Sequence, residues 1–558
     1  MIRVATPKVF AREATGLVRA VSVWDAFLFN NWTAGGAWSS LTWVSLYPIW
    51  FPNADIIGAL FITMIISTLT GLVYAFAVTV MPRSASDYVF VSRSLTPAIG
   101  VGFALNNLFW WMMINSWNVY VPFAFISQTM FSVGAMISSP ALITGWSGFS
   151  TTTNLIILGI LIYAFANLAI LFGVRHYLKT FQRITNILSL VAFAIIIYYF
   201  LAFGRDTFIT NFTHYFSPLS GTPDPYHDII NLASSLGYTP NPLGGGIHLP
   251  FAPGYDWNQT VAVAVLWWFI SLAVMGSAWI AGEVKSAGNV KAQVFAMLGA
   301  NIFTLGIAAF FEFLWFRVFD YNWVAALGYI TINYPSKVPA WITPAAPYWG
   351  EQWVNIMIGN VPLALLISIA WFLQGVAVIT PLILMASRQI FAWSFDRIIP
   401  TKFSEVSDRF ASPILSVAVI SIVTICGFLF TVLTTWVNFA VAAPMGVLWS
   451  LLIVSIASVV FWKRRKAFYE SSPVGRLKAL GIPVQPLVGV LSSIGILIGI
   501  YYYFGPINPL ALGGISLPVT EISFGLFIAG AAGYYVAKFI QQKRGVDVGL
   551  AFEEIPPE

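Results

Sequence analysis

The chain has 558 residues, of which 58% are hydrophobic and 9% are charged, and its mean hydropathy is +0.81. Soluble domains carry roughly 25% charged residues, so this composition excludes a soluble enzyme, a soluble nucleic-acid binder and a secreted scaffold. Apolar stretches of about 20 residues, the length that crosses a bilayer as a helix, recur along the whole chain. The sequence therefore predicts an all-α polytopic membrane protein.

Twelve hydrophobic stretches are predicted to span the membrane. In chain order they cover residues 22–48, 56–81, 97–133, 154–173, 182–203, 260–282, 293–318, 354–392, 413–434, 437–462, 484–504 and 521–540. The N-terminus has no signal-peptide apolar core or cleavage site, so the first span is expected to stay in the mature protein.

The basic residues support this count and set an orientation. If the N-terminus is cytoplasmic, every Lys and Arg falls in a cytoplasmic segment except Arg205, Arg317 and Lys337, as the positive-inside rule requires. The net charge of +6 then follows from topology, and no nucleic-acid partner is expected. The prediction is a multi-pass protein of the plasma membrane with both termini cytoplasmic, in contact with the lipid bilayer.

The spans divide the chain into seven segments. They are a cytoplasmic N-terminal segment (1–21), spans 1–5 (22–203), an extracellular loop (204–258), spans 6–10 (259–462), a basic cytoplasmic linker (463–483), spans 11–12 (484–540) and a cytoplasmic tail (541–558). The loop 204–258 is rich in Pro, Gly and aromatic residues and is expected to be irregular. Its length suggests an ordered role, which the sequence does not define.

Chemistry that depends on clustered reactive groups is not indicated. The single cysteine, Cys426, cannot form an intrachain disulfide. No zinc-protease motif, Walker-type loop or paired carboxylates occur, so no enzyme, metal site or cofactor is predicted.

Span 1 contains the clearest candidate for a binding site. Residues 30–37 (NNWTAGGA) bring polar and small residues to about the middle of the membrane. Paired glycines permit a helix to unwind, and broken helices in transporters hold polar ligands with their free backbone groups. Close packing of small residues against another helix explains the same pattern equally well.

Span 6 has a second patch of small residues, 271–279 (SLAVMGSAW). Spans 1 and 6 are five apart, the relation expected if spans 1–5 and 6–10 are inverted repeats. This pairing strengthens both candidates.

Three acidic residues lie in or near the spans, and each has a basic residue nearby in the sequence. Asp25 follows Arg19, Glu283 precedes Lys285, and Glu312 precedes Arg317. All three are expected near the membrane surfaces, where gating or helix-end pairing is favoured over proton transfer.

Three segments between the spans resemble those of the amino acid–polyamine–organocation permeases, over roughly residues 12–465. Residues 81–100 are similar to the family pattern fPxxGGdYvyxsRxlgp, with Ala85 and Ser86 in place of glycines. Residues 276–293 resemble aeEvknPxrnip, and 386–406 resemble aSRxlyaxaRDgxlPxxfaxv. The matching positions are Pro82, Asp87, Tyr88, Val89, Ser92, Arg93, Glu283, Val284, Lys285, Asn289, Ser387, Arg388, Asp396 and Pro400.

The resemblance implies a five-plus-five inverted-repeat fold with two additional C-terminal helices. It also implies secondary transport of amino acids by alternating access, with the substrate carboxylate on the broken span 1 and its amine on the broken span 6. The corresponding residues are Trp32, Thr33, Ala34, Gly35, Gly36, Ala273, Val274, Met275, Gly276, Ser277 and Trp279. Met275 and Trp279 suggest a preference for apolar side chains.

Several alternatives stay open. The substrate could be a polyamine, another organic cation or an organic acid, and the same fold could serve a non-transporting amino-acid sensor. A proton or sodium ion could be coupled to transport. Some proton-coupled relatives have a lysine in span 5 where this chain has Ser189, and sodium-coupled relatives use span 8 hydroxyls, here Thr380 or Ser387. The oligomeric state is not indicated.

Overall fold

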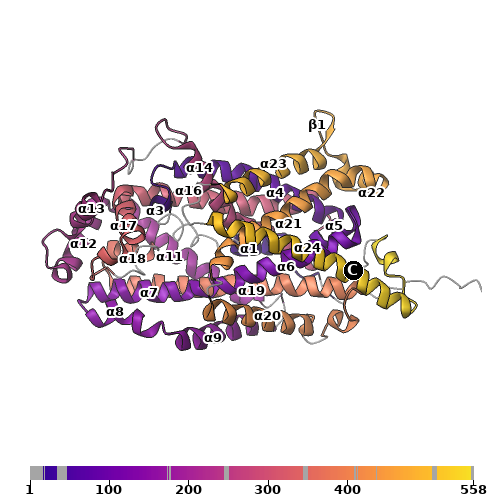
Figure 1. Cartoon of the computed structure of the whole chain (residues 1–558), viewed down its shortest axis with the longest axis horizontal. Helices are drawn as coiled ribbons and strands as arrows, with labels where there is room; N and C mark the ends of the chain where they lie inside the picture. The colour runs from indigo at the N-terminus through magenta and orange to yellow at the C-terminus, as the bar shows by residue number, and fades with distance from the viewer. Residues whose placement is uncertain are drawn as a thin grey trace, which may run out of the picture.

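The computed structural model describes most of the chain apart from its two ends and several internal stretches. The described residues are 17, 19–33, 47–171, 174, 177–243, 250–342, 350–407, 410, 412–434, 437–505 and 512–553. They form an elongated bundle of helices with one small hairpin of two strands (Figure 1).

Ten helical segments in the described part of the chain are long and apolar enough to cross a membrane. They coincide with predicted spans 2–5 and 7–12, and the all-α polytopic architecture is thereby confirmed. Their helices are α4 (Ile56–Val80), α6 (Pro97–Asn118) with α7 (Tyr120–Met136), α9 (Thr152–Leu171), α11 (Gln182–Ala202), α16 (Ala300–Val318), α19 (Val361–Phe395), α20 (Ile414–Leu433), α21 (Val437–Arg464), α23 (Val484–Phe504) and α24 (Leu512–Lys543). The total of twelve spans and the inverted repeat stay predictions.

Predicted spans 1 and 6 differ from the ten long helices. Of span 1 the structure describes α1 (Val23–Thr33), and residues 34–46 lie outside the described residues. α14 (Trp257–Ser271) of span 6 has 15 residues, too few to cross a hydrocarbon core about 30 Å thick at about 1.5 Å per residue. After α14 the chain continues as the 3-10 helices η2 (Leu272–Ala278) and η3 (Ala281–Glu283). Span 6 thus leaves the α conformation within the stretch of small residues.

Shorter elements connect the spans. They are α3 (Tyr47–Trp50), α5 (Ser86–Ser94), α8 (Pro140–Phe149), the π-helix η1 (Tyr177–Phe181), α12 (Arg205–Ser220), α13 (Pro225–Ser235), α15 (Val290–Val294), the π-helix η4 (Phe295–Gly299), α17 (Tyr321–Asn333), η5 (Pro335–Lys337), α18 (Glu351–Ile358), η6 (Thr401–Ser404), α22 (Lys466–Ser471), η7 (Pro473–Arg476), β1 (Lys478–Ala479), β2 (Ile482–Pro483) and η8 (Val548–Phe552). β1 and β2 pair antiparallel.

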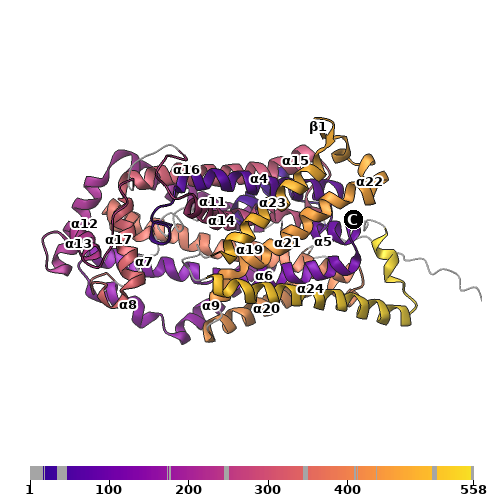
Figure 2. The same ribbon diagram turned by 45° about the horizontal axis from the view of Figure 1, so that its top comes forward.

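The two ends of the bundle carry different elements (Figures 1 and 2). We call the end that holds α12, α13, α17 and α18 the aromatic end, and the end that holds α5, α22, β1 and the C-terminus the basic end. Arg93 and Lys466 belong to elements of the basic end, and Arg205 begins α12 at the aromatic end. These residues therefore lie at opposite ends, as the predicted segregation of basic residues requires.

The aromatic end corrects the expectation of an irregular loop over residues 204–258, because α12 and α13 lie there. Phe208, Phe212 and Phe216 recur every four residues on α12 and are fully buried. The Phe212 ring packs edge-on against Trp323 of α17, at 5.3 Å between ring centroids, and lies 6.0 Å from Trp353 of α18. This helical period of apolar residues is present in the sequence, but the surrounding prolines and glycines obscured it.

Large apolar side chains remain exposed along the outer spans. Leu161 of α9 is 58% exposed, Ile422 of α20 is 62% exposed and Ile528 of α24 is 70% exposed. A soluble protein avoids extended apolar surfaces of this kind, whereas lipid tails are a suitable environment for them. The exposed apolar surface is therefore consistent with helices that face a bilayer.

Glycines allow α24 to lie directly against α6. A Cβ atom added at Gly530 would lie 2.6 Å from the Cα of Gly102 and 2.8 Å from the Val101 carbonyl oxygen, both backbone atoms. A Cβ at Gly533, also on α24, would meet nothing within 4 Å. Close approach of backbones at small residues is a common way to pack membrane helices.

Gly530→Ala is expected to destabilise the protein, since the two backbones must separate to admit the methyl group. Overpacking of this kind costs about 1–3 kcal/mol. Gly533→Ala is the matched control and should be neutral or slightly stabilising, because alanine favours the helix over glycine. Thermal unfolding of both variants in detergent would measure the difference, and equal midpoints would contradict the close α6–α24 packing.

Candidate functional site

Predicted spans 1 and 6 meet in the structure, and Asn30 joins them. The Asn30 Nδ2 donates hydrogen bonds to the Ser277 Oγ (2.9 Å) and to the Ala296 carbonyl oxygen (2.8 Å). Its Oδ1 accepts a hydrogen bond from the Ser277 backbone N–H at 2.7 Å. Asn30 is fully buried, so one side chain fixes α1 against η2 and against η4. The two candidate segments, 247 residues apart, are thus neighbours.

Small side chains allow this contact to be close. A Cβ atom added at Gly276 would lie 3.2 Å from the Phe29 ring, 3.4 Å from the Thr33 Cγ2 and 3.2 Å from the Met385 Sδ. The Thr33 hydroxyl donates to the Phe29 carbonyl oxygen within α1. Gly276 therefore lies at a point where α1, η2 and α19 meet.

Apart from Gly276, the predicted binding residues fall into two groups. Ala34, Gly35 and Gly36 lie outside the described residues, as does the side chain of Ala273. The others are buried and belong to α1, to η2 or, for Trp279, to the position after η2. They are Trp32, Thr33, Val274, Met275, Ser277 and Trp279. The Trp32 Nε1 has no hydrogen-bond partner among the described residues.

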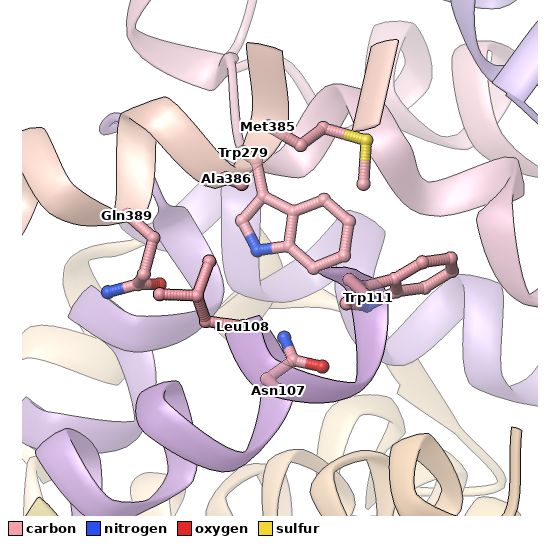
Figure 3. A pocket seen from close by; sticks show the side chains of 7 residues that line it. All are labelled: Asn107, Leu108, Trp111, Trp279, Met385, Ala386 and Gln389. Carbon is pink, nitrogen blue, oxygen red and sulfur yellow. The ribbon is translucent and has the colours of Figure 1, made fainter. Parts of the chain in front are cut away.

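A cavity lies beside Trp279, the residue that follows η2. It contains about 230 Å³ of space between atoms, including open solvent at its mouth. Figure 3 shows the side chains that line it, which are Asn107, Leu108 and Trp111 of α6, Trp279, and Met385, Ala386 and Gln389 of α19. The Trp111 and Trp279 rings meet edge-on at 5.5 Å between centroids. The lining combines aromatic and apolar surface with two neutral amides.

Three backbone hydrogen bonds join segments beside this cavity. The Val21 backbone N–H donates to the Glu283 carbonyl oxygen (2.9 Å), and the Lys285 N–H donates to the Val21 carbonyl oxygen (2.9 Å). The Ala85 N–H donates to the Trp279 carbonyl oxygen (2.9 Å). The start of α1 and the residues before α5 are therefore tied to the segment that follows η2.

The hydrogen bond from the Ala85 N–H to the Trp279 carbonyl oxygen comes with an unusual backbone conformation at Ala85. Its φ is +50°, in the left-handed region, which costs a residue with a Cβ roughly 1–2 kcal/mol. The family pattern that this segment resembles has glycine here, and glycine adopts this conformation freely. The departure from the pattern thus leaves the turn in place at some cost in stability.

A buried ion pair also lies at this end. The Arg388 Nε donates to the Glu283 Oε1 at 2.7 Å, and their side chains are 0% and 4% exposed. The sequence placed Glu283 beside Lys285, but in the structure Glu283 pairs with Arg388 of α19. The sequence does not show this because the partners are 105 residues apart.

The other two acidic residues also differ from expectation. The Asp25 Oδ1 accepts from the Arg183 Nη2 of α11 at 3.3 Å. Glu312, expected near the membrane surface with Arg317, is fully buried, and its carboxylate oxygens have no hydrogen-bond partner among the described residues. Arg317 instead donates to the carbonyl oxygens of Phe200 and Leu201.

The three hydroxyls considered for a coupling ion are not brought together. The Ser189 Oγ donates to the Gln374 Oε1 (3.1 Å), the Thr380 Oγ1 to the Ala166 carbonyl oxygen (3.5 Å), and the Ser387 Oγ to the Leu384 carbonyl oxygen (2.6 Å). Each hydroxyl thus has a different partner. Within the described chain, no three or more His, Cys, Asp or Glu side chains form a group that could hold a metal ion.

Sequence reasoning did not assign a role to Asn30, Asn107, Trp111 or Asp87. Asn30 lies inside the polar stretch of span 1, and Asp87 lies inside the segment 81–100. The sequence therefore marks both residues but does not show which residues they contact. Asn107 and Trp111 stand in an apolar span with no local feature that separates them from packing residues.

A family model described as "Amino acid permease" matches residues 22–528 of the chain. The match covers nearly every described helix and includes predicted spans 1 and 6. Comparison with curated proteins finds no match.

Proposed function

The chain belongs to the amino acid permease family, a family of membrane transporters and not of enzymes, and on that premise we propose that it is a secondary active transporter of amino acids. Its substrate binds where spans 1 and 6 are interrupted, and alternating access carries it across the plasma membrane. In this proposal both termini are cytoplasmic, so the basic end faces the cytoplasm and the aromatic end faces outward. Twelve spans and an inverted repeat complete the architecture.

The observation that carries the proposal is the Asn30–Ser277 contact. It joins α1 to a stretch of span 6 that has left the α conformation. α14 ends at Ser271, and the carbonyl end of a helix carries partial negative charge. Such an end near this contact suits the ammonium group of an amino acid.

The cavity beside Trp279 supports an amino acid with an uncharged side chain. Met385 touches the Gly276 position and also lines the cavity, so the cavity adjoins the interrupted segment. Its aromatic and apolar lining suits an apolar side chain. A polyamine would need further anionic partners, and the described lining contains none.

Uptake into proteoliposomes tests the proposal. The purified full chain is reconstituted and given a mixture of radiolabelled amino acids, with protein-free liposomes as the control. We expect uptake that unlabelled apolar amino acids compete for and that putrescine and organic acids do not. Competition by putrescine or an organic acid alone would overturn the amino-acid assignment. Thermal stabilisation by an amino acid without any uptake would instead identify a sensor.

A further inference from the structure

A carboxylate with no role in the proposed binding site lies directly behind the cavity. Asp87, the second residue of α5, is fully buried. Its Oδ2 accepts hydrogen bonds from the Trp279 Nε1 (2.7 Å) and the Asn107 Nδ2 (3.1 Å), and its Oδ1 accepts from the Tyr88 backbone N–H (2.8 Å). Asp87 therefore joins α5 to α6 and to the segment that follows η2. We call Asp87, Asn107 and Trp279 the Asp87 cluster.

All three donors are neutral, and the nearest arginine on α5 is already engaged. Arg93 forms a two-pronged pair with Asp396, with Nη1–Oδ2 and Nη2–Oδ1 distances of 2.8 Å. The Tyr88 hydroxyl donates to the same Asp396 carboxylate at 2.9 Å. No cationic group is among the causes that shift the pKa of Asp87.

Among the described residues, the elements packed on α5 bring no cation to Asp87 either. α4 contributes the phenol of Tyr74, which interacts electrostatically with Asp87, and α6 contributes the neutral Asn107. α21 packs the apolar Phe461 on Phe90 of α5, and its basic residues, Lys463 and Arg464, are exposed at its end. In the part of the chain that the structure describes, Asp87 is thus a buried carboxylate held by neutral donors alone.

Two opposing effects set the protonation of this group. Burial disfavours the charged carboxylate and raises its pKa, whereas the hydrogen bonds from Trp279 and Tyr88 favour the charge and lower it. Burial has the larger effect, and the pKa of Asp87 is raised to about 7. The residue therefore exchanges its proton within the physiological range of pH.

We propose that Asp87 is a proton-binding residue that holds Trp279 against α5 and α6 when it is ionised and releases Trp279 when it is protonated. Hydrogen bonds to an ionised acceptor are roughly twice as strong as neutral ones. A proton on Oδ2 occupies the atom that now accepts from both Trp279 and Asn107. Protonation thus weakens two bonds at once, and no covalent bond is formed or broken other than that to the proton.

The inference rests on the proposed function, because it concerns movement of span 6 during alternating access. The segment after η2 lies between the cavity and the basic end, and it is tied there through Ala85 and Glu283. A substrate that leaves toward the basic end requires this segment to move. Release of Trp279 by a proton couples that movement to proton binding, so the coupling ion is a proton and not sodium.

Two assays on the reconstituted full chain separate proton coupling from transport itself. The first measures counterflow exchange of a transported amino acid with equal pH on both sides, from about pH 5.5 to 8.5 around the titration of the group. The second measures accumulation driven by an imposed proton gradient. For the wild-type protein we expect exchange that depends on pH, and accumulation that follows the gradient and not a sodium gradient.

Asp87→Asn keeps the shape of the side chain and removes its titration. We expect this variant to retain exchange, to lose the pH dependence of exchange, and to lose about tenfold or more of the gradient-driven accumulation. Glu405→Gln, at an exposed carboxyl after η6, is the control and should match the wild type. An Asp87→Asn variant that accumulates like the wild type, or retains its pH dependence, overturns the proposal.

A second variant covers the case in which Asp87→Asn does not fold. Trp279→Phe removes the indole donor, so the pKa of Asp87 should rise and the midpoint of the pH dependence should move to higher pH. An unchanged midpoint would overturn the proposal, since a purely structural role predicts no shift. If the wild-type protein exchanges amino acids but shows neither pH dependence nor gradient-driven accumulation, only the proton inference is overturned. If the wild-type protein shows no exchange at all, the proposed function is overturned and the inference with it.

Discussion

Replacing Asn30 with leucine is expected to reduce amino-acid uptake by at least about tenfold. Leucine is similar in size but forms no hydrogen bonds, so the Ser277 N–H and the Ala296 carbonyl oxygen lose their Asn30 partner. Each buried polar group left unpaired costs about 1–3 kcal/mol. A change of only about 1.4 kcal/mol in the barrier of the transport cycle corresponds to tenfold in rate.

The experiment compares uptake at equal amounts of folded, reconstituted protein. Asn333→Leu is the control, because Asn333 is exposed at the end of α17 and its Nδ2 donates only to the Tyr329 carbonyl oxygen. The control should transport at the wild-type rate. Wild-type uptake by Asn30→Leu would show that the α1–η2 contact does not position the substrate site.

Arg388→Met should have the largest effect on stability. The substitution leaves the Glu283 carboxylate buried without its cation, and breaking a buried ion pair in this way costs about 3–5 kcal/mol. The cost is high because the carboxylate has lost its solvation on burial and regains no partner. We expect a clearly lower midpoint of thermal unfolding in detergent, together with loss of uptake.

The double variant Glu283→Gln/Arg388→Met separates loss of the charge pair from loss of packing. With neither charge present, much of the stability lost in Arg388→Met should return, because neutral replacement of both partners is often tolerated. The stability lost in the double variant is compared with the sum of the losses in Glu283→Gln and Arg388→Met, and the difference measures the coupling between the two residues. A double variant less stable than Arg388→Met would contradict the view that the unpaired Glu283 charge is the cause.

The spans themselves could be predicted from the sequence because the bilayer imposes a local rule. Any helix inside the hydrocarbon must be apolar over about 20 residues, and this property is read from consecutive residues. Ten of the twelve predicted spans reappear as long apolar helices. Of the remaining two, span 6 leaves the α conformation at its small residues, whereas residues 34–46 of span 1 lie outside the described residues.

The partners of the polar residues were decided only by the tertiary structure. The sequence suggested Lys285 for Glu283, but Arg388 of α19 forms the pair, and Arg317 turns away from Glu312. Neighbours along the chain are poor guides here, because only residues three or four apart face each other on a helix, and these pairs are two and five residues apart.

The sequence by itself determined that this is a polytopic membrane protein, where ten of its spans lie, and where span 6 leaves the α conformation. Hydrophobicity and the ability of the backbone to leave the α conformation are properties of short stretches. They can therefore be read from consecutive residues. The joining of Asn30 to Ser277, and of Asp87 to Asn107 and Trp279, depends on how distant helices pack. A buried polar group takes its partner from whichever element packing brings within reach, and that is decided only when the chain has folded.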